Sequence, residues 1–242
     1  SADTLFRIGS VTKMLTAASL LQQVQAGKIE LDKPAVTYIP AYHYNYDSSW
    51  APSVKVWNFL THTSGLNDYL VVDGPTDDAS LESFLTGETY ANRGYMMAPA
   101  GVMYNYSNPN FMLAGLIAEK VCGTSYRLCL KRGVFDKLGM TRTFLLPADA
   151  INDGDVSDGY CNQLCPQIET VGIDSYDNAW ARPAGYAISS VSDLAAFANF
   201  LMKGDERVLN DEVRVGMISE QINTKEYLDV ASYGYGIMVY KG

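Results

Sequence analysis

A lysine on the apolar side of a predicted helix is the feature that most constrains this chain. The residues after Gly9 show helical periodicity up to about Ala26, and Gly27 marks the C-terminal end of the helix. Ser10 lies near the centre of the apolar face and Lys13 lies close beside it, so both side chains are predicted to point inward. The apolar face is formed by Val11, Met14, Leu15, Ala17, Ala18, Leu20, Leu21 and Val24, and the opposite, polar face by Thr12, Thr16, Ser19 and Gln23.

This placement has two interpretations. Ser-x-x-Lys arises by chance about once in a chain of this length, and a lysine near a helix start can extend its ammonium group to water. Alternatively, burial makes Lys13 neutral, so that it can activate Ser10 as a nucleophile. The free N–H groups at a helix start would favour the negative charge that such a reaction develops. Ser10 is therefore a candidate nucleophile and Lys13 its candidate base.

The composition indicates one compact globular unit. The chain has 242 residues, of which 48% are hydrophobic and 19% charged. Its formal charge of −9 argues against nucleic acid or an anionic membrane as partner, and no apolar run is long enough for a transmembrane helix. No signal peptide is visible, so the N-terminus does not specify a compartment, and nothing specifies the oligomeric state.

The four cysteines form two local pairs. Cys161 and Cys165 lie in a polar loop, where either a small disulfide or free thiols remain open. Cys122 and Cys129 flank a Gly-Thr-Ser segment between two helical stretches and are predicted to be buried free thiols. Metal ligation is disfavoured because both histidines are distant in sequence from these pairs.

A second informative segment precedes another predicted helix. Pro109 suits the first position of that helix, with Asn108 as its N-cap, although Ser107 could cap it instead. The helix is predicted to end at Gly123. Tyr106 is one of seventeen tyrosines and carries no functional meaning by itself.

Ser10-Val11-Thr12-Lys13 and Tyr106-Ser107-Asn108, in this order and separation, resemble the serine β-lactamase and penicillin-binding-protein superfamily. The resemblance is closest to its class C branch, with the related esterases and D-aminopeptidases. Residues 60–66, 135–140, 184–194 and 233–236 are also similar to segments of this branch, and they extend the resemblance over nearly the whole chain. One departure is Lys137, where the family usually has proline.

The resemblance implies a serine acyl hydrolase that forms an acyl-enzyme on β-lactams, D-peptides or small esters. It implies Ser10 as nucleophile, Lys13 as base and Tyr106 as the companion acid/base, with a pKa lowered by the lysine. Asn108 would bind the substrate amide, and the Ser10 N–H would form half of an oxyanion hole. The partner would be a small-molecule or peptide substrate, with no cofactor, no metal and no nucleic acid, in a periplasmic or secreted protein.

The resemblance also implies an α+β fold of the β-lactamase/transpeptidase type, with a helical lobe and an antiparallel-sheet lobe. Residues 30–185 are expected to form the mainly helical lobe, and residues 1–29 and 186–242 parts of the α/β lobe. The family's third signature, a Lys- or His-started triad ending in Gly, would lie beyond Tyr240, and Lys241-Gly242 is not that triad. Much of the sheet would lie outside these residues, so residues 1–242 alone are expected to be weakly active or inactive.

Two further function classes compete with the hydrolase. One is a catalytically silent binding or structural homologue, and the other is an unrelated helical protein with chance matches. A Ser/His pair of His62 and Ser64 is disfavoured because the chain has no G-x-S-x-G motif, and His62 is predicted to stabilise a turn.

The distances from Tyr106 and Lys13 to Ser10 distinguish an active enzyme from a catalytically silent homologue. Proton transfer requires the Tyr106 hydroxyl and the Lys13 ammonium to lie within about 2.6–3.2 Å of the Ser10 hydroxyl, directly or through water. The amide of Asn108 should face the same cleft. A separation of Tyr106 and Ser10 above about 8 Å would remove the case for Tyr106.

Overall fold

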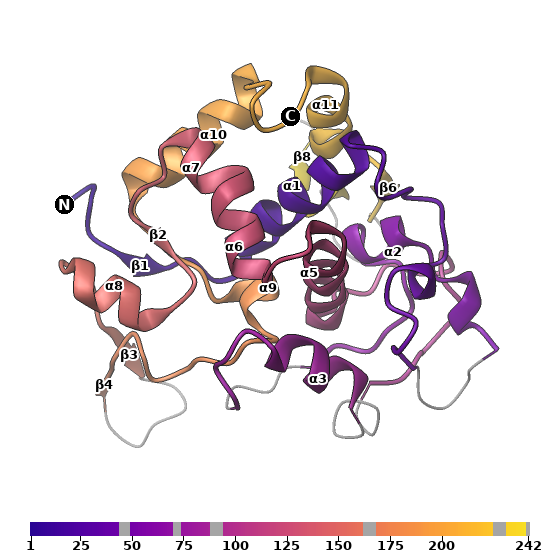
Figure 1. The fold of residues 1–242 in the computed structure, drawn as a ribbon, viewed down its shortest axis with the longest axis horizontal. Helices are drawn as coiled ribbons and strands as arrows, with labels where there is room; N and C mark the ends of the chain where they lie inside the picture. The colour runs from indigo at the N-terminus through magenta and orange to yellow at the C-terminus, as the bar shows by residue number, and fades with distance from the viewer. Residues whose placement is uncertain (44–48, 70–73, 88–93, 162–167, 225–230, 241–242) are drawn as a thin grey trace.

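Two helices form the centre of the molecule. The computed structural model describes residues 1–43, 49–69, 74–87, 94–161, 168–224 and 231–240. Helices α1 (Thr12–Gln25) and α5 (Asn108–Cys122) pack against each other, and the remaining elements surround them (Figure 1). Within the described ranges the other α-helices are α2 (Val56–Leu60), α3 (Ser80–Thr86), α6 (Tyr126–Leu130), α7 (Asp136–Leu138), α8 (Pro147–Asp153), α9 (Arg182–Gly185), α10 (Val191–Lys203) and α11 (Asp211–Ile218).

The described strands are short and pair antiparallel. One sheet has the order β1 (Phe6–Arg7), β5 (Ile188–Ser189), β2 (Thr143–Phe144), and it places the segment before α1 beside the segment after α9. A hairpin joins β3 (Gly159–Cys161) to β4 (Glu169–Val171). A third sheet has the order β6 (Ile222–Asn223), β7 (Ala231–Tyr233), β8 (Met238–Tyr240). The helix-rich, antiparallel architecture agrees with the expectation, whereas the two-lobe boundaries at residues 30 and 185 stay a prediction.

Helix α1 has the predicted bounds but not the predicted polar face. Thr12, Thr16 and Ser19 are all fully buried, and so are five residues of the apolar face, namely Leu15, Ala17, Ala18, Leu20 and Leu21. The Thr16 hydroxyl lies 2.7 Å from the carbonyl oxygen of Pro183 and 2.7 Å from the hydroxyl of Tyr126. Small hydroxyl side chains can be buried at low cost when each finds such a partner. The prediction of a solvent-facing side was therefore wrong, because α1 is surrounded by protein.

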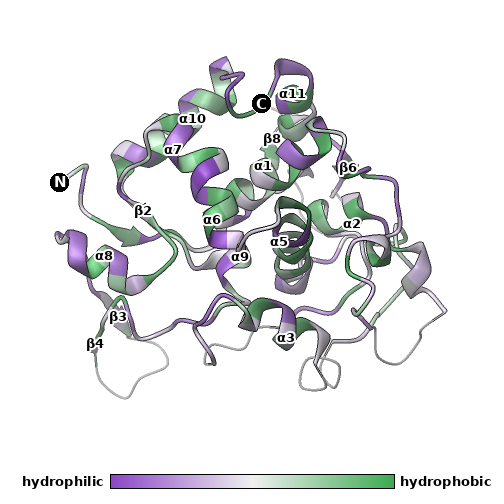
Figure 2. Ribbon diagram, viewed as in Figure 1, coloured by the Kyte–Doolittle hydropathy of each residue, from purple (hydrophilic) through white to green (hydrophobic). Residues whose placement is uncertain are grey.

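Helix α5 begins one residue earlier than predicted. Ser107 holds the N-cap position by backbone geometry, as in the alternative that the sequence left open, although its side chain makes no capping hydrogen bond, and Asn108 is the first helical residue. Pro109 stands within the first turn, where its missing N–H costs no hydrogen bond. Gly123 ends the helix in the left-handed conformation with φ +73°, as predicted. Figure 2 shows α5 and α2 as predominantly hydrophobic segments.

Three local features concern the second half of the chain. The sequence favours Ser192 as the N-cap of α10, but the N-cap is Ser190, which accepts a hydrogen bond from the Asp193 N–H. The sequence between residues 146 and 183 shows little periodicity, yet this segment contains α8, β3 and β4. The alternating residues from Tyr233 to Tyr240 suggest one strand, but residues 234–237 form a turn between β7 and β8, where Gly236 adopts a left-handed φ of +77°.

The cysteine prediction at α5 was wrong. Cys122 and Cys129 form a disulfide with their Cα atoms 6.2 Å apart, so that the end of α5 is covalently tied to α6. A local pair separated by seven residues meets because the chain reverses at Gly123 between the two helices. The possible Cys161–Cys165 bridge involves Cys165, which lies outside the described residues. No described helix is both long and apolar enough to cross a membrane.

Gly115 sets how closely α5 approaches α9, and this contact yields a first prediction. A Cβ atom at position 115 would lie 2.4 Å from Cγ of Pro183, whose ring cannot rotate away. We expect Gly115→Ala to lower the free energy of unfolding by about 1–3 kcal/mol, measured by urea denaturation. The control is Gly216→Ala in α11, where a Cβ meets no atom within 4 Å, and it should raise stability by up to about 1 kcal/mol. Equal effects of the two substitutions would contradict the steric argument.

Candidate active site

Ser10 lies at the surface, one turn before the buried Lys13. It is the middle residue of the 3-10 turn Gly9–Val11 that leads into α1. Gly9 has a φ of +50°, a conformation that side chains disfavour, and this turn presents the exposed Ser10 to solvent. Ser10 thus does not point inward as predicted, whereas Lys13 does, with only 1% of its surface exposed.

The Lys13 Nζ has three oxygen partners. It lies 3.1 Å from Ser10 Oγ, 2.8 Å from Asn108 Oδ1 and 2.7 Å from the carbonyl oxygen of Ala184 on α9. It also lies over the Tyr106 ring, 4.8 Å from the ring centroid. Burial lowers the pKa of Lys13 to about 7, and the Asp68 carboxylate opposes this effect. Lys13 can therefore exchange a proton near neutral pH, which an exposed lysine cannot do.

The Tyr106 hydroxyl donates a hydrogen bond to Ser10 Oγ over 2.7 Å. The predicted convergence of Tyr106 and Lys13 on Ser10 is therefore confirmed as geometry, while the roles of these residues stay predictions. The predicted lowering of the Tyr106 pKa was wrong. Burial raises the pKa of Tyr106, its hydrogen bond to Ser10 acts in the opposite direction, and Asp68 adds to the increase. The Tyr106 phenol is consequently protonated at neutral pH.

Asn108 joins Lys13 to a carboxylate that the sequence analysis missed. The Asn108 Nδ2 group donates to Asp68 Oδ1 over 3.1 Å, and the backbone N–H of Asn108 donates to the same oxygen over 2.9 Å. Asp68 follows the 60–66 segment by two residues and lies 40 positions from Asn108 in sequence. Helical or strand periodicity carries no signal for this contact, because Asp68 belongs to an irregular segment.

His62 is the residue beneath Tyr106. It is fully buried in a turn with φ +57°, as a turn residue was predicted, and its ring centroid lies 4.4 Å from that of Tyr106. His62 Nδ1 accepts a hydrogen bond from the Ser107 N–H over 3.1 Å. Burial holds the pKa of His62 well below its ordinary value, so the ring is neutral with its proton on Nε2. His62 thus supports the Tyr106 segment and forms no Ser/His pair with Ser64, whose hydroxyl donates to Asn110.

Helix α9 is held in place by a buried arginine. Arg182 is 1% exposed and pairs with Asp177 at 2.7 Å and with Asp78 at 3.3 Å. Two residues later, the Ala184 carbonyl accepts from Lys13. The burial of Arg182 was not predicted, because it depends on Asp78, which lies 104 residues away in sequence, as well as on the nearby Asp177.

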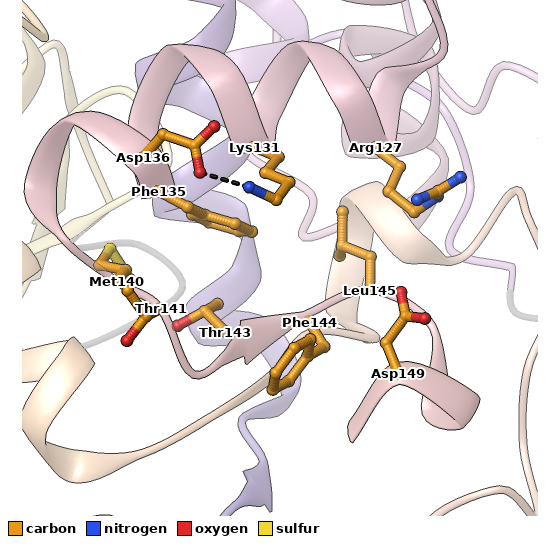
Figure 3. Close-up of a pocket in the computed structure, with 10 residues that line it drawn as sticks. All are labelled: Arg127, Lys131, Phe135, Asp136, Met140, Thr141, Thr143, Phe144, Leu145 and Asp149. Atoms are coloured by element: carbon orange, nitrogen blue, oxygen red, sulfur yellow. Dashed lines mark hydrogen bonds and ion pairs between the residues drawn. The ribbon is translucent and has the colours of Figure 1, made fainter. Parts of the chain in front are cut away.

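A separate cavity among the described residues contains none of the predicted site residues. A cavity of about 250 Å³ lies between α6, α7, β2 and α8, where Lys131 is paired with Asp136 (Figure 3). It is lined by Arg127, Lys131, Phe135, Asp136, Met140, Thr141, Thr143, Phe144, Leu145 and Asp149. Among the described residues, no group of three or more His, Cys, Asp or Glu side chains is placed to hold a metal ion.

Comparisons with known proteins identify the family of the chain. The sequence model of the β-lactamase family matches residues 1–242. Penicillin-binding protein 4 of Amycolatopsis lactamdurans is 27% identical over 215 residues, which cover 89% of this chain and 55% of that protein. The chain therefore spans about half the length of this curated relative.

Solved structures extend the comparison to the fold. An octameric penicillin-binding-protein homologue from Pyrococcus abyssi superposes with a TM-score of 0.82 at 24% identity, over 99% of this chain and 54% of that one. A D-stereospecific amidohydrolase from Streptomyces has a TM-score of 0.73 at 26% identity, over 98% of this chain and 71% of that one. The fold expected from the sequence, that of β-lactamases and transpeptidases, is thereby confirmed.

Proposed function

We propose that this chain, which belongs to the β-lactamase family, contributes a serine acyl-hydrolase site in which Ser10 becomes acylated. The single observation that carries the proposal is the environment of the Lys13 Nζ. Two of its three partners, Asn108 Oδ1 and the Ala184 carbonyl oxygen, can only accept hydrogen bonds. In neutral Lys13 they take both amine hydrogens, which leaves the nitrogen lone pair for the Ser10 hydroxyl.

The acylation step follows from this arrangement. Neutral Lys13 takes the hydroxyl proton as Ser10 Oγ forms a bond to a substrate carbonyl carbon and the carbonyl π electrons move to its oxygen. The Ser10 N–H belongs to the first residues of a helical segment, whose N–H groups have no intrahelical acceptor, and would bind this oxyanion.

The intermediate collapses when the leaving group departs. Tyr106, which is protonated at neutral pH, donates its proton to the leaving nitrogen or oxygen as the bond to the carbonyl carbon breaks. The proton held by Lys13 compensates for the one that Tyr106 has lost. In the second half-reaction, deprotonated Tyr106 takes a proton from water as the water oxygen bonds to the acyl carbon. The bond from that carbon to Ser10 Oγ then breaks as the Lys13 ammonium returns its proton to Oγ, which restores all three residues. Asn108 would contact the substrate amide through the second hydrogen of Nδ2, since the first donates to Asp68.

The substrate classes proposed are β-lactams, D-peptides and small esters. Support comes from the relatives: one is named a penicillin-binding protein and another a D-stereospecific amidohydrolase. All three classes present a carbonyl with a nitrogen or oxygen leaving group, which is what the Ser10, Lys13 and Tyr106 arrangement requires. By the same likeness we propose that the protein acts in the periplasm or outside the cell.

Covalent labelling tests the proposal and is our second prediction. A fluorophosphonate and a penicillin should each add one tag, located at Ser10 by peptide mass spectrometry, in the full-length protein that contains this chain. The labelling rate should rise with pH with a midpoint of about 7, because Lys13 must lose its proton first. Ser10→Ala should abolish the tag. A tag on another serine would contradict the assignment, and failure of both probes would identify a catalytically silent homologue.

A further inference from the structure

The Asp68 carboxylate occupies a position that the proposed chemistry does not yet explain. Its Oδ1 accepts two hydrogen bonds from Asn108, one from the backbone N–H and one from Nδ2. Asn108 is the first residue of the 15-residue helix α5, so Asp68 supplies the capping acceptor that the Ser107 side chain does not. The Ser107 hydroxyl donates instead to the backbone oxygen of Asn67, next to Asp68.

A carboxylate decides which way the Asn108 amide points. An ionised carboxylate can only accept hydrogen bonds, so the Asn108 NH₂ group must face Asp68 and the amide oxygen must face away from it. That oxygen is the one that lies 2.8 Å from Lys13 Nζ. If the amide turned over, an NH₂ group would face the Lys13 amine, and two donors would meet without an acceptor.

We propose that Asp68 is a positioning residue of the Ser10 site: it holds the Asn108 amide so that its oxygen faces Lys13. This inference rests on the proposed function, in which Lys13 transfers the Ser10 proton. Hydrogen bonds thus run from Asp68 through Asn108 and Lys13 to Ser10.

The charge of Asp68 adds to its geometric role. Among the described residues, the titratable groups that interact with Lys13 are Asp68 and His62 from the 61–68 segment and Tyr106 before α5. Arg182 of α9 is paired with carboxylates, and the charged residues of α5, Glu119 and Lys120, stand near its opposite end. His62 is neutral and Tyr106 is protonated, so Asp68 is the charge that favours the ammonium form of Lys13. Asp68 therefore limits how far burial lowers the pKa of Lys13, so that neutral Lys13 remains a stronger base.

The substitution Asp68→Asn removes the negative charge and the fixed acceptor of Asp68 but keeps the size of the side chain. Asparagine keeps the size of Asp68 and an oxygen for the Asn108 N–H, but it has no charge and can also present an NH₂ group. We expect the proton-binding midpoint of Lys13, followed by NMR of ¹³C-labelled lysine side chains, to fall by roughly half to one pH unit. The pH at which Ser10 labelling reaches half its maximum should fall by the same amount. Asp68→Glu, which keeps the charge, should restore at least part of both shifts.

Glu206→Gln is the matched control, because Glu206 is exposed and distant in sequence from every residue of the site. It removes the same charge and should leave both midpoints unchanged. Circular dichroism establishes that each variant is folded. A folded Asp68→Asn protein whose Lys13 midpoint equals that of the wild type would overturn the inference.

The two measurements also distinguish this inference from the proposed function. The NMR midpoint of Lys13 does not depend on any reaction at Ser10. If the wild type fails to label at Ser10, the proposed function is wrong, yet a shifted Lys13 midpoint in Asp68→Asn still supports the positioning role of Asp68.

Discussion

Lys13→Met should slow acylation of Ser10 by roughly 10³- to 10⁴-fold at pH 8, within the range expected when a general base is removed. Methionine is unbranched and suits the buried path of the lysine side chain along α1, where only 1% of the residue surface is exposed. The variant therefore removes the amine while filling similar space. The measurement is the second-order rate constant for fluorophosphonate labelling, followed by intact-protein mass spectrometry.

Two further variants sharpen this result. Lys13→Arg keeps the positive charge but never becomes neutral in water, so it should be as slow as Lys13→Met if Lys13 acts as a base. Lys28→Met replaces an exposed lysine just after α1 and should label at the wild-type rate. Labelling of Lys13→Met within tenfold of the wild type would exclude Lys13 as the base.

The second large effect concerns stability against pH. The pKa of Lys13 falls from 10.5 to about 7 on folding, because burial disfavours the ammonium group. Between these values the unfolded chain binds a proton that the folded chain does not, so the free energy of unfolding rises with pH. Below about pH 7 both states carry the proton, and this contribution to stability is absent.

The expected size is about 2 kcal/mol between pH 7 and pH 9, since each full pH unit between the two pKa values corresponds to about 1.4 kcal/mol and the folded state is still half protonated at pH 7. Urea denaturation of the wild type and of Lys13→Met at several pH values in this window isolates the effect, because all other groups are shared. The stability of the wild type relative to the variant should rise steadily. Parallel stability curves for the two proteins would show that Lys13 is not perturbed by folding.

Local sequence patterns were sufficient to predict helix α1, the ends of α1 and α5, and the inward position of Lys13. Helical periodicity placed α1 correctly and identified Lys13 as inward, since side-chain direction in a helix depends only on spacing. Gly27 and Gly123 marked helix ends because a left-handed conformation after a helix favours glycine. The approach of Tyr106 to Ser10 was expected from the family resemblance and from the need of buried Lys13 for a polar partner, because spacing says nothing about residues 96 positions apart.

The electrostatics of the site depend on the packing of distant segments. The Tyr106 pKa is raised because the tertiary structure buries its ring against His62, which no pattern around residue 106 indicates. The same holds for Thr16, which was predicted to face solvent but is covered by α6 and α9. Periodicity describes one helix at a time, whereas burial is a property of everything packed around that helix.

Asp68 shows the same limit most clearly. Its sequence neighbours predict an irregular segment and nothing more, and its effect on Lys13 requires Asn108 to stand between them. The Ser-x-x-Lys motif alone placed Ser10 and Lys13 one helical turn apart, because residues three positions apart are neighbours on the surface of a helix. The partners that orient the base and set its proton affinity come from segments 95 and 171 residues away, and only the folded chain brings their oxygen atoms within hydrogen-bonding distance.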